Sequence, residues 1–409
     1  MTLPWLPVEP LAAPDLARLR RRAIFDCCKW DPQVEDVATV AGVPLVLRRE
    51  TWVELAGLAE ALAGETLAAE AELLARLDLH RRLALPRAVR AALARVPRDG
   101  AAAGVARLIR FDFHHTPEGW RISEANTDVP GGLNEASGFP TLLAPHYPGA
   151  TPVGDPAAAY VAALLAAAPA GAVIALVHAT AYSDDRQVMS YLADRLAAAG
   201  ARPQLVSPDH LRWSGGRARL ETAWSRDPVD LIIRFFPAEW LPNLPRAAEW
   251  ARYFAGATTP MSNPAAALLT QSKRLPLVWD DLATPLPTWR AVLPETRDPR
   301  AAPWRREDGW VLKPALGRVG EDVAISGVAS PKDWRRVSRA ARWYPGHWIA
   351  QRRFEATRFQ VNGTALYPCV GVYTVDRRAV GAYGRLASRP LIDWRAQDAA
   401  ILAVAEHGG

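Results

Sequence analysis

The spacing of apolar residues predicts a helical start to the chain, followed by a hairpin. Residues 11–24 and 52–96 carry apolar side chains at helical spacing, the second segment with short interruptions. Residues 105–113 alternate between polar and apolar, as a half-buried strand does, and residues 119–124 follow as a partner strand. Between them, residues 116–119 (TPEG) favour a tight turn, because proline suits its second position and glycine its left-handed one. We therefore predict a β-hairpin with a three-residue loop.

The rest of the chain alternates strands with a helix and then continues in strand pairs. After a glycine-rich loop, the pattern predicts a strand, a helix and two strands, at residues 172–177, 184–199, 203–206 and 230–236. This order is typical of a βαβ unit with a mostly parallel sheet. A helical segment at residues 265–277 precedes further strands, predicted at residues 310–313, 322–326, 347–354, 366–375 and 379–385. The proline-rich residues 284–303 are interpreted as a linker or domain edge.

These elements place the chain in the mixed α/β (α+β) class. At about 100–200 residues per domain, 409 residues correspond to two or three domains. We predict a helical N-terminal region with the hairpin at residues 1–150, a βαβ domain at residues 151–257, and a lysine-containing domain with the C-terminal sheet at residues 258–409.

The composition is that of a globular protein. Half of the residues are apolar and 22% are charged, unlike a disordered chain, a collagen or a disulfide-rich scaffold. No apolar run approaches the about 20 uncharged residues of a membrane helix, and the first residues lack a signal-peptide pattern. Two of the three cysteines, Cys27 and Cys28, are adjacent and have no further ligands at metal-binding spacing. We expect a cytoplasmic protein with reduced thiols, in which this pair has a packing role.

The positive charge is carried almost entirely by arginine. The chain has 49 basic and 43 acidic residues, and only four of the basic ones are lysines: Lys29, Lys273, Lys313 and Lys332. We attribute the excess of arginine to a genomic base-composition bias. A nucleic-acid-binding protein would gather its charge on one face beside stacking aromatics, and the sequence shows no such patch. We therefore rank nucleic-acid binding last and expect neither a nucleic-acid nor a membrane partner.

The predicted hairpin places several polar side chains on one face. With a three-residue loop, Asp112 faces Glu124 and Arg110 faces Asn126. Two carboxylates about 5 Å apart repel each other. A divalent cation between them would remove the repulsion, since Mg²⁺ prefers such oxygen ligands, and the arginine would then face phosphate oxygens. The alternative is a solvent-facing polar strand, and the hairpin alone does not separate the two; His114, on the same face, is expected to be a solvated turn residue.

Two of the lysines favour a nucleotide site. Lys313 ends an apolar strand and precedes residues 314–321 (PALGRVGE), a glycine-containing loop whose backbone amides would cover phosphates. Lys273 lies in the predicted helical segment after a proline-rich turn, and the alternative for it is an exposed helix lysine. Arginine does not replace lysine where a compact, flexible ammonium reaches a phosphate. Lys29 and Lys332 lack such a context and are expected at the surface.

The order of these motifs resembles that of a known family. The motifs are Arg110-Phe111-Asp112, Glu124-Ala125-Asn126, Gln271-Ser272-Lys273, residues 311–318 (VLKPALGR), Tyr367-Pro368 and Arg385. From about residue 26 to residue 390 the chain resembles the glutathionylspermidine synthase family, a circularly permuted branch of the ATP-grasp ligases. The resemblance implies a permuted ATP-grasp-like fold with an embedded pre-ATP-grasp-like βαβ domain. The acidic hairpin precedes both lysines here, whereas most ATP-grasp chains place it last.

The resemblance implies metal-binding and catalytic roles for residues of the sheet. Asp112, Glu124 and Asn126 resemble ligands of two Mg²⁺ ions on ATP. Arg110 resembles the contact to the γ-phosphate, which stabilises the transferred charge. Arg385 resembles the late arginine that stabilises the acyl-phosphate and tetrahedral states, and the alternative for it is a surface arginine at a strand end.

The resemblance also implies a set of nucleotide contacts. Lys273 and Lys313 would hold the α- and β-phosphates of ATP. The loop from Gly317 to Gly320 would be the closing lid, and the segment from Gln351 to Phe354 the hinge whose backbone meets adenine.

The implied reaction is ATP-dependent formation of an amide bond. Phosphorylation gives a carboxylate a good leaving group, and an amine then displaces phosphate, so that ADP and phosphate are released. The partners would be a small-molecule or peptide carboxylate and an amine. The family loop has glutamate where Val319 stands, the chain ends soon after Arg385, and it has no room for the amidase domain of some members. We therefore predict amide ligation without naming glutathione or spermidine; the alternative is a catalytically silent nucleotide- or peptide-binding protein of the same fold.

Overall fold

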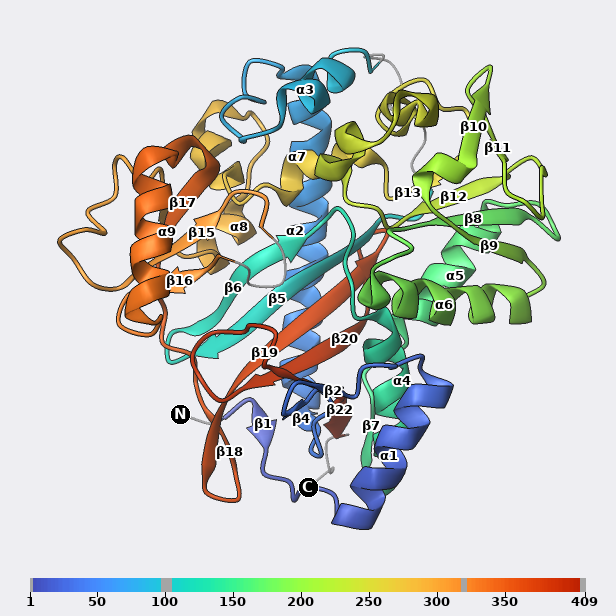
Figure 1. The fold of residues 1–409 in the computed structure, drawn as a ribbon. Helices are drawn as coiled ribbons and strands as arrows, with labels where there is room; N and C mark the ends of the chain where they lie inside the picture. The colour runs from blue at the N-terminus through green and yellow to red at the C-terminus, as the bar shows by residue number, and fades with distance from the viewer. Residues whose placement is uncertain (1–2, 97–104, 318–321, 405–409) are drawn as a thin grey trace.

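Among the residues that the structure describes, four sheets of four or more strands organise the fold (Figure 1). The computed structural model describes residues 3–96, 105–317 and 322–404. One sheet has six strands and three have four, with helices packed between and around them. This confirms the mixed α/β class.

The six-stranded central sheet is antiparallel and carries the predicted hairpin. Its strands run in the order β21-β20-β19-β5-β6, with β18 paired to β19. Their bounds are Leu108–Thr116 (β5), Gly119–Asn126 (β6), Phe359–Val361 (β18), Thr364–Val375 (β19), Arg378–Ala387 (β20) and Gln397–Ala399 (β21). Because β5 pairs with β19, residues from distant parts of the sequence share one face.

A long helix, α2 (Arg49–Ala75), runs behind the central sheet (Figure 1). Its buried residues include Leu55, Leu62 and Leu73, which recur at helical spacing and therefore lie on one side. That side packs on β19 and β20. With α1 (Ala13–Asp26) and α3 (Arg87–Leu93), α2 confirms the helical start. Although α2 has 27 residues, neither it nor any other helix in the described part of the chain is long and apolar enough to cross a membrane.

A parallel four-stranded sheet confirms the predicted βαβ unit. Its order is β13-β12-β8-β9, and all three pairings are parallel. The elements are β8 (Val173–Val177), α6 (Ser183–Ala198), β9 (Arg202–Val206), β12 (Leu231–Arg234) and β13 (Met261–Ser262). All five residues of β8 are buried and apolar, as expected for a strand covered on both faces. The flanking elements include α4 (Leu133–Leu143), α5 (Pro156–Ala166) and the ribbon of β10 (Leu211–Ser214) and β11 (Arg217–Leu220).

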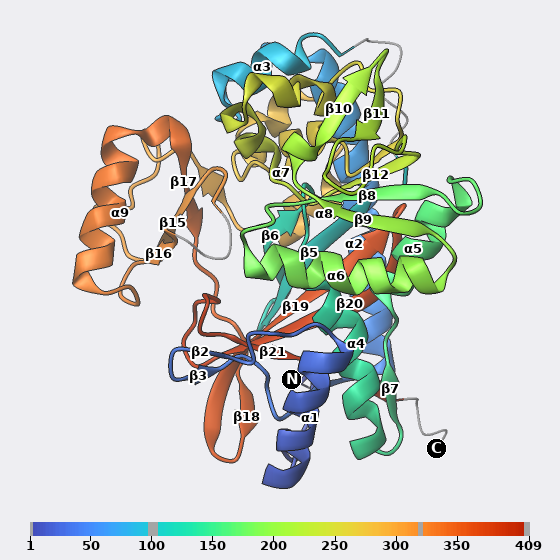
Figure 2. The same cartoon turned by 45° about the vertical axis from the view of Figure 1, so that its right-hand side comes forward.

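The segment that carries Lys313 forms a separate antiparallel sheet. Its order is β14-β17-β15-β16, with bounds Thr296–Arg297 (β14), Trp310–Pro314 (β15), Ala324–Ile325 (β16) and Trp348–Arg352 (β17). Helix α9 (Pro331–Trp343) packs on one face of it through Val337 and Ala341 against Trp310 and Leu312. We call this sheet with α9 the small lobe. Figure 2 shows it to one side of the central sheet.

The two ends of the described chain meet in a fourth sheet. Its order is β1-β4-β22-β7, with bounds Trp5–Leu6 (β1), Leu45–Arg48 (β4), Ala150–Pro152 (β7) and Ile401–Val404 (β22). A short ribbon of β2 (Gln33–Val34) and β3 (Val37–Ala38) lies nearby in the chain. The central and terminal sheets both combine strands from residues 1–150 and 258–409, and the predicted domain boundaries stay a prediction.

Two predicted elements differ from the structure. The helix expected at residues 265–277 is broken into α7 (Leu268–Gln271), flanked by 3-10 turns at Ala265–Ala267 and Leu275–Asp281. Lys273 lies in the break, because Ser272 is extended and Pro276 cannot continue the hydrogen-bonding pattern of a helix. The expected linker at residues 284–303 contains α8 (Pro287–Val292) and β14, and Trp289 packs edge-on against the core ring of Phe111.

Candidate active site

The hairpin aligns its charged residues as predicted, but through a different turn. Thr116 pairs with Gly119 instead of Trp120, so the loop has two residues, and the Thr116 hydroxyl donates to the Gly119 carbonyl at 2.7 Å. The register shifts by one between Asp112 and the next pair, which leaves Ser123 as the extra residue of a β-bulge. The bulge offsets the shorter loop.

Four strands bring one row of residues together on the face of the central sheet. Tyr383 pairs with Gly371, Gly371 with Asp112, and Asp112 with Glu124. Residues two positions away on each strand point to the same side, which adds Arg110, Asn126 and Arg385 to this face. All five predicted metal and catalytic residues therefore share one face of the sheet.

Arg110 and Asp112 form a bidentate pair. Nε and Nη2 of Arg110 donate to the two carboxylate oxygens of Asp112 at 2.7 and 2.9 Å. Its Nη1 donates to the Gly131 carbonyl at 2.8 Å, and its guanidinium lies over the rings of Tyr373 and Tyr383. These contacts use all three guanidinium nitrogens and fix the plane of the group.

Gly371 is a site residue that sequence reasoning missed. A Cβ atom at this position would lie 2.8 Å from Cδ of Arg110 and 2.9 Å from Oδ1 of Asp112. Only glycine therefore leaves room for the ion pair above β19. Gly371 is far from the hairpin in the sequence, so nothing near it identifies Arg110 and Asp112 as its neighbours. Its place inside a predicted strand is the one available signal, because glycine there indicates a close approach.

Glu124 pairs with Lys273, which sits at the break after α7. The ammonium lies 3.0 Å from Oε2 of Glu124 and donates to the carbonyl of Gly317 at 2.7 Å. Burial favours the neutral acid, but Lys273 and Lys313 outweigh it and lower the pKa of Glu124 to about 2. The carboxylate is thus charged at neutral pH. The next loop residues, which include Gly320, lie outside the described part of the chain.

Lys313 reaches from the small lobe to the hairpin. Its ammonium donates to the Ser123 carbonyl at 2.9 Å and to Oε1 of Gln351 at 2.8 Å. Burial, with help from Lys273, lowers its pKa to about 8, although Glu124 acts in the opposite direction. The bulged residue of the hairpin is therefore the one whose carbonyl receives this lysine.

His114 and Phe354 close this end of the site. The two rings lie 5.1 Å apart, and the His114 ring nitrogen Nε2 is 3.1 Å from the Ser123 hydroxyl. Burial lowers the pKa of His114 to about 4, with the charge of Lys313 acting in the same direction. The expectation of a solvated turn histidine is therefore wrong, because His114 is buried with its ring against Phe354 and Ser123.

Arg385 is largely buried on the sheet face, with 18% of its side chain exposed, and is not a surface arginine. Its Nη2 donates to the carbonyls of Asp393 and Ala396 at 2.9 and 3.0 Å, and its Nε lies 3.6 Å from Oδ1 of Asp398. Burial would lower its pKa, but Asp398 contributes to a net rise. The group stays charged near Asp398.

Lys29 neutralises the acidic residues behind Arg385. Its ammonium lies 2.9 Å from Glu135, 3.0 Å from Asp398 and 3.4 Å from Asp31. Only 7% of the residue is exposed, so the expectation of a surface lysine is wrong. The three acids lie on α4, on β21 and in the segment after α1. The first two of these elements are far from Lys29 in the sequence, so only the folded chain brings their acids to it.

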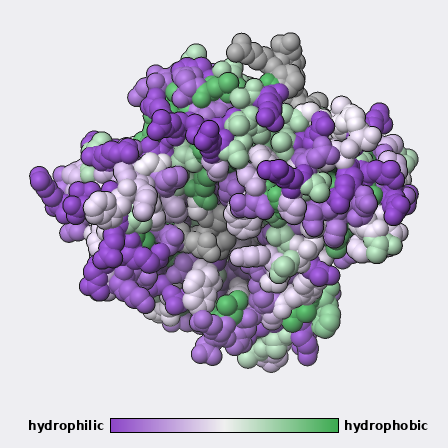
Figure 3. Space-filling model, turned by 45° about the horizontal axis from the view of Figure 1, so that its top comes forward, coloured by the Kyte–Doolittle hydropathy of each residue, from purple (hydrophilic) through white to green (hydrophobic). Residues whose placement is uncertain are grey.

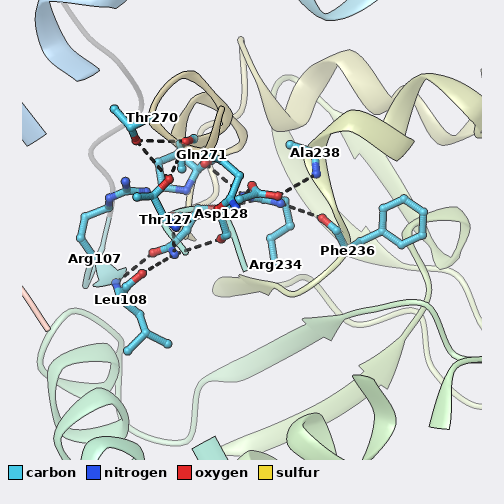
Figure 4. Close-up of polar contacts among 12 residues, drawn as sticks. Arg107, Leu108, Thr127, Asp128, Arg234, Phe236, Ala238, Thr270 and Gln271 are labelled. Atoms are coloured by element: carbon cyan, nitrogen blue, oxygen red, sulfur yellow. Dashed lines mark hydrogen bonds and ion pairs between the residues drawn. The ribbon is translucent and has the colours of Figure 1, made fainter. Parts of the chain in front are cut away.

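A second buried network joins the hairpin to the parallel sheet (Figure 4). Asp128 and Arg234, both with fully buried side chains, lie 2.5 Å apart. The Gln271 side-chain oxygen accepts from the backbone nitrogens of Thr127 and Asp128, and Asn263 donates to the carbonyls of both residues. This network holds the end of β6 against α7, two residues before Lys273.

The oxygen-rich donor set of the hairpin fits Mg²⁺ bound together with a nucleotide. Asp112 and Glu124 oppose each other, and Asn126 donates to Asp112 at 3.1 Å. Mg²⁺ in such sites takes one or two carboxylates and completes its shell with phosphates and water. Within residues 3–96, 105–317 and 322–404, no group of three or more histidine, cysteine, aspartate or glutamate residues is placed to hold a metal. The predicted set has two carboxylates and one amide.

The acidic hairpin, the sheet around it and the lysine-bearing small lobe have the architecture of ATP-grasp proteins. The chain belongs to the glutathionylspermidine synthase family, and it matches the family described as "Glutathionylspermidine synthase preATP-grasp" over residues 50–397. The family predicted from the motifs is therefore confirmed. The circular permutation stays a prediction.

One solved structure shares the fold at low sequence identity. The glutathione synthetase-like effector GSS30 from Globodera pallida, in its apo form, aligns with a TM-score of 0.62 and 12% identity, over 96% of this chain and 98% of that one. A protein assigned as gamma-glutamylcysteine synthetase from Methylobacillus flagellatus aligns with a TM-score of 0.43 and 15% identity, over 80% and 82%. No curated protein sequence matches the chain significantly.

Proposed function

We propose that the protein is an ATP-dependent carboxylate–amine ligase that works through an acyl-phosphate. The observation that carries the proposal is the convergence on one sheet face of two opposed carboxylates, Asp112 and Glu124, with Arg110 and two lysines from separate elements. Two acidic and three basic side chains that are mostly buried suit a ligand with both phosphates and metal ions. Family membership supports the same class of reaction.

The phosphates of ATP would lie between the central sheet and the small lobe. Lys273 and Lys313, whose ammonium groups both point to the hairpin, would contact the α- and β-phosphates. Gly317, whose carbonyl already meets Lys273, begins the covering loop that we extend to Gly320. The end of β17, from Gln351 to Phe354, would receive adenine.

Asp112, Glu124 and Asn126 would hold Mg²⁺, two ions in this proposal, which neutralises phosphate charge when bound. Arg110 would face the γ-phosphate and stabilise the charge that develops during its transfer. Arg385, two strands away, would bind the acyl-phosphate and the tetrahedral state that follows. Because Arg385 already meets two carbonyls and Asp398, its guanidinium is oriented before substrate binds.

The reaction proceeds in two balanced steps. A carboxylate oxygen of the substrate attacks the γ-phosphorus, and the bond to ADP breaks. The nitrogen of the amine substrate then attacks the acyl carbon. The bond between this carbon and the bridging oxygen breaks, so that phosphate leaves with that oxygen, and the nitrogen loses a proton. Water would divert the first product by hydrolysis, so the lobe and its loop must close over the site.

A phosphate-release screen tests the proposal. A panel of carboxylates is crossed with a panel of amines in the presence of Mg·ATP, and release that needs both substrates is the expected result. Glu124→Gln should abolish the release, whereas Glu118→Gln, an exposed glutamate on the turn of the same hairpin, should leave it unchanged. Full activity of Glu124→Gln in a productive pair would reject the assignment.

One observation favours a second candidate, a nucleotide- or peptide-binding protein without turnover. Both carboxylates of the hairpin already pair with cations, Asp112 with Arg110 and Glu124 with Lys273, so neither carboxylate requires a metal to offset its charge. Tight Mg·ATP binding with no ADP formation for any pair in the screen would support this candidate.

A further inference from the structure

The outward side of α9 carries a stripe of basic residues. Arg335, Arg339 and Arg342 recur at spacings of four and three, so they lie along one side of the helix over about 10 Å. Lys332 precedes the stripe, and all four residues are exposed. We call these residues, with Trp343 and Tyr344, the α9 basic face. Helix α9 lies on the left of the molecule in Figure 1, and hydrophilic residues predominate on that side in Figure 3.

The arginines of this face form no ion pair among the described residues, and the guanidinium of Arg342 lies over the ring of Trp343, 5.7 Å from its centre. Arg336, the neighbouring arginine, pairs with two acids of the described residues, Asp322 and Asp333. Within the described ranges, the three arginines of the stripe have no ion-pair partner. Glu307 and Asp308 line the same hollow as Arg339 and Arg342. Glu307 forms an ion pair with Arg352, and Asp308 accepts a hydrogen bond from Ser326.

Two large aromatic side chains are exposed beside these charges. Trp343 and Tyr344 each have 68% of their surface exposed. Arg339 and Trp343 line two surface hollows, of ≈ 460 and ≈ 530 Å³. Val337 and Ala341 anchor the helix on its other side, so the packing of α9 does not require either ring at the surface.

The α9 basic face is separate from the proposed active site. Trp310 and Leu312 of β15 point to α9, whereas Lys313, the next residue, points to the central sheet. The two functions would therefore use opposite faces of the small lobe.

We propose that the α9 basic face binds single-stranded nucleic acid. The unpaired arginines would contact backbone phosphates, and the exposed rings would stack on bases, the combination found in sequence-tolerant single-strand binders. An acidic polypeptide would match the charge but has no need of two exposed aromatic side chains. The sequence expectation of no nucleic-acid partner rested on the lack of a gathered patch. Helix formation gathers the charges, and the fold leaves the rings beside them uncovered.

The test is binding of fluorescein-labelled oligo(dT)12 to the full chain, measured by anisotropy at several salt concentrations. Each neutralised phosphate contributes about −0.7 to the slope of log affinity against log salt, so three contacts predict a slope of about −2. The triple variant Arg335→Gln, Arg339→Gln and Arg342→Gln should lower affinity at least tenfold and flatten the slope. The Trp343→Ala variant should lower affinity by roughly tenfold with the slope unchanged.

A matched triple controls for general attraction by a basic protein. Arg21, Arg81 and Arg87 are exposed and lie outside α9, and their change to glutamine removes the same charge. This control should bind the oligonucleotide within twofold of the unaltered chain. Equal losses in both triples would overturn the proposal, and so would equally tight binding of a twelve-residue polyglutamate, which would point to an acidic protein partner. Mg·ATP binding, measured in parallel, should be unchanged in both triples, so its loss would report on folding and not on this face.

Discussion

A single methyl group at Gly371 should disable nucleotide binding. In Gly371→Ala, the new Cβ would lie within 3.0 Å of both Arg110 and Asp112, closer than such atoms approach in folded proteins. Arg110 is fixed by hydrogen bonds of 2.7, 2.9 and 2.8 Å and by two tyrosine rings, so it cannot turn aside without losing them. The carboxylate of Asp112 must then move away from its position opposite Glu124.

The expected losses of stability and of Mg·ATP affinity follow from overpacking at Gly371 and from disruption of the ion pair between Arg110 and Asp112. Overpacking of a filled site destabilises by about 1–3 kcal/mol. We expect the dissociation constant for Mg·ATP to rise at least tenfold, which corresponds to about 1.4 kcal/mol of binding free energy. The loss should exceed that of a distant substitution, since Asp112 is a proposed metal ligand.

Titration calorimetry with Mg·ATP and a denaturant unfolding curve check this prediction. Gly57→Ala is the matched control, because Gly57 is exposed on α2 and a Cβ there would meet no atom within 4 Å. This control should keep its affinity and gain about 0.5–1 kcal/mol of stability, as alanine favours helix. The reasoning is refuted if Gly371→Ala binds Mg·ATP within twofold of the unaltered protein.

Three further predictions follow from the buried charges. Because burial lowers the pKa of Lys313 to about 8, the free protein loses this charge as pH rises. The affinity for Mg·ATP, measured by calorimetry, should therefore fall between pH 7 and pH 9. Lys313→Arg should bind Mg·ATP more weakly at pH 7, but its affinity should not change over this pH range. Arg234→Met should lower the unfolding free energy in urea by about 3–5 kcal/mol, since it removes the guanidinium that pairs with the buried carboxylate of Asp128, and adding Asp128→Leu should restore part of the loss. Lys29→Met should destabilise by a similar amount at pH 7 and by less at pH 5, since burial raises the pKa of Glu135; equal losses at both values would contradict this.

Local patterns predicted the elements and the hairpin face well. Alternation over β5 and β6 identified the strands, and the pairing of Asp112 with Glu124 is confirmed. The pairing was nevertheless derived from a loop one residue too long. The bulge at Ser123 restored it, and a bulge leaves no distinct signal in a strand of mixed composition.

Contacts between segments that are distant in the sequence could not be predicted from it. The chain pairs Asp128 with Arg234 and places Gly371 beneath Asp112, and in neither case does one partner carry a local sign of the other. Such contacts depend on how β12 and β19 pack against the rest of the fold. A single sequence does not reveal that packing, so it cannot predict which distant residues meet. The break at Lys273 was missed for a related reason, since its backbone nitrogen is held by the carbonyl of Ala315 in the small lobe.

The scarcity of lysine is the most informative feature of the composition, and it extends to Lys29, which was predicted at the surface. Three of the four lysines are largely buried, and each meets two or more oxygens: Lys29 has three carboxylates, Lys273 a carboxylate and a carbonyl, and Lys313 a carbonyl and an amide. An ammonium directs three donors to oxygens on different sides, which a planar guanidinium cannot do in the same space. A bias toward arginine would therefore leave lysine where this geometry is required. By this reasoning Lys29 marks a structural centre beside Arg385, as the other two mark the nucleotide site, and Lys29→Arg should destabilise the protein although it keeps the charge.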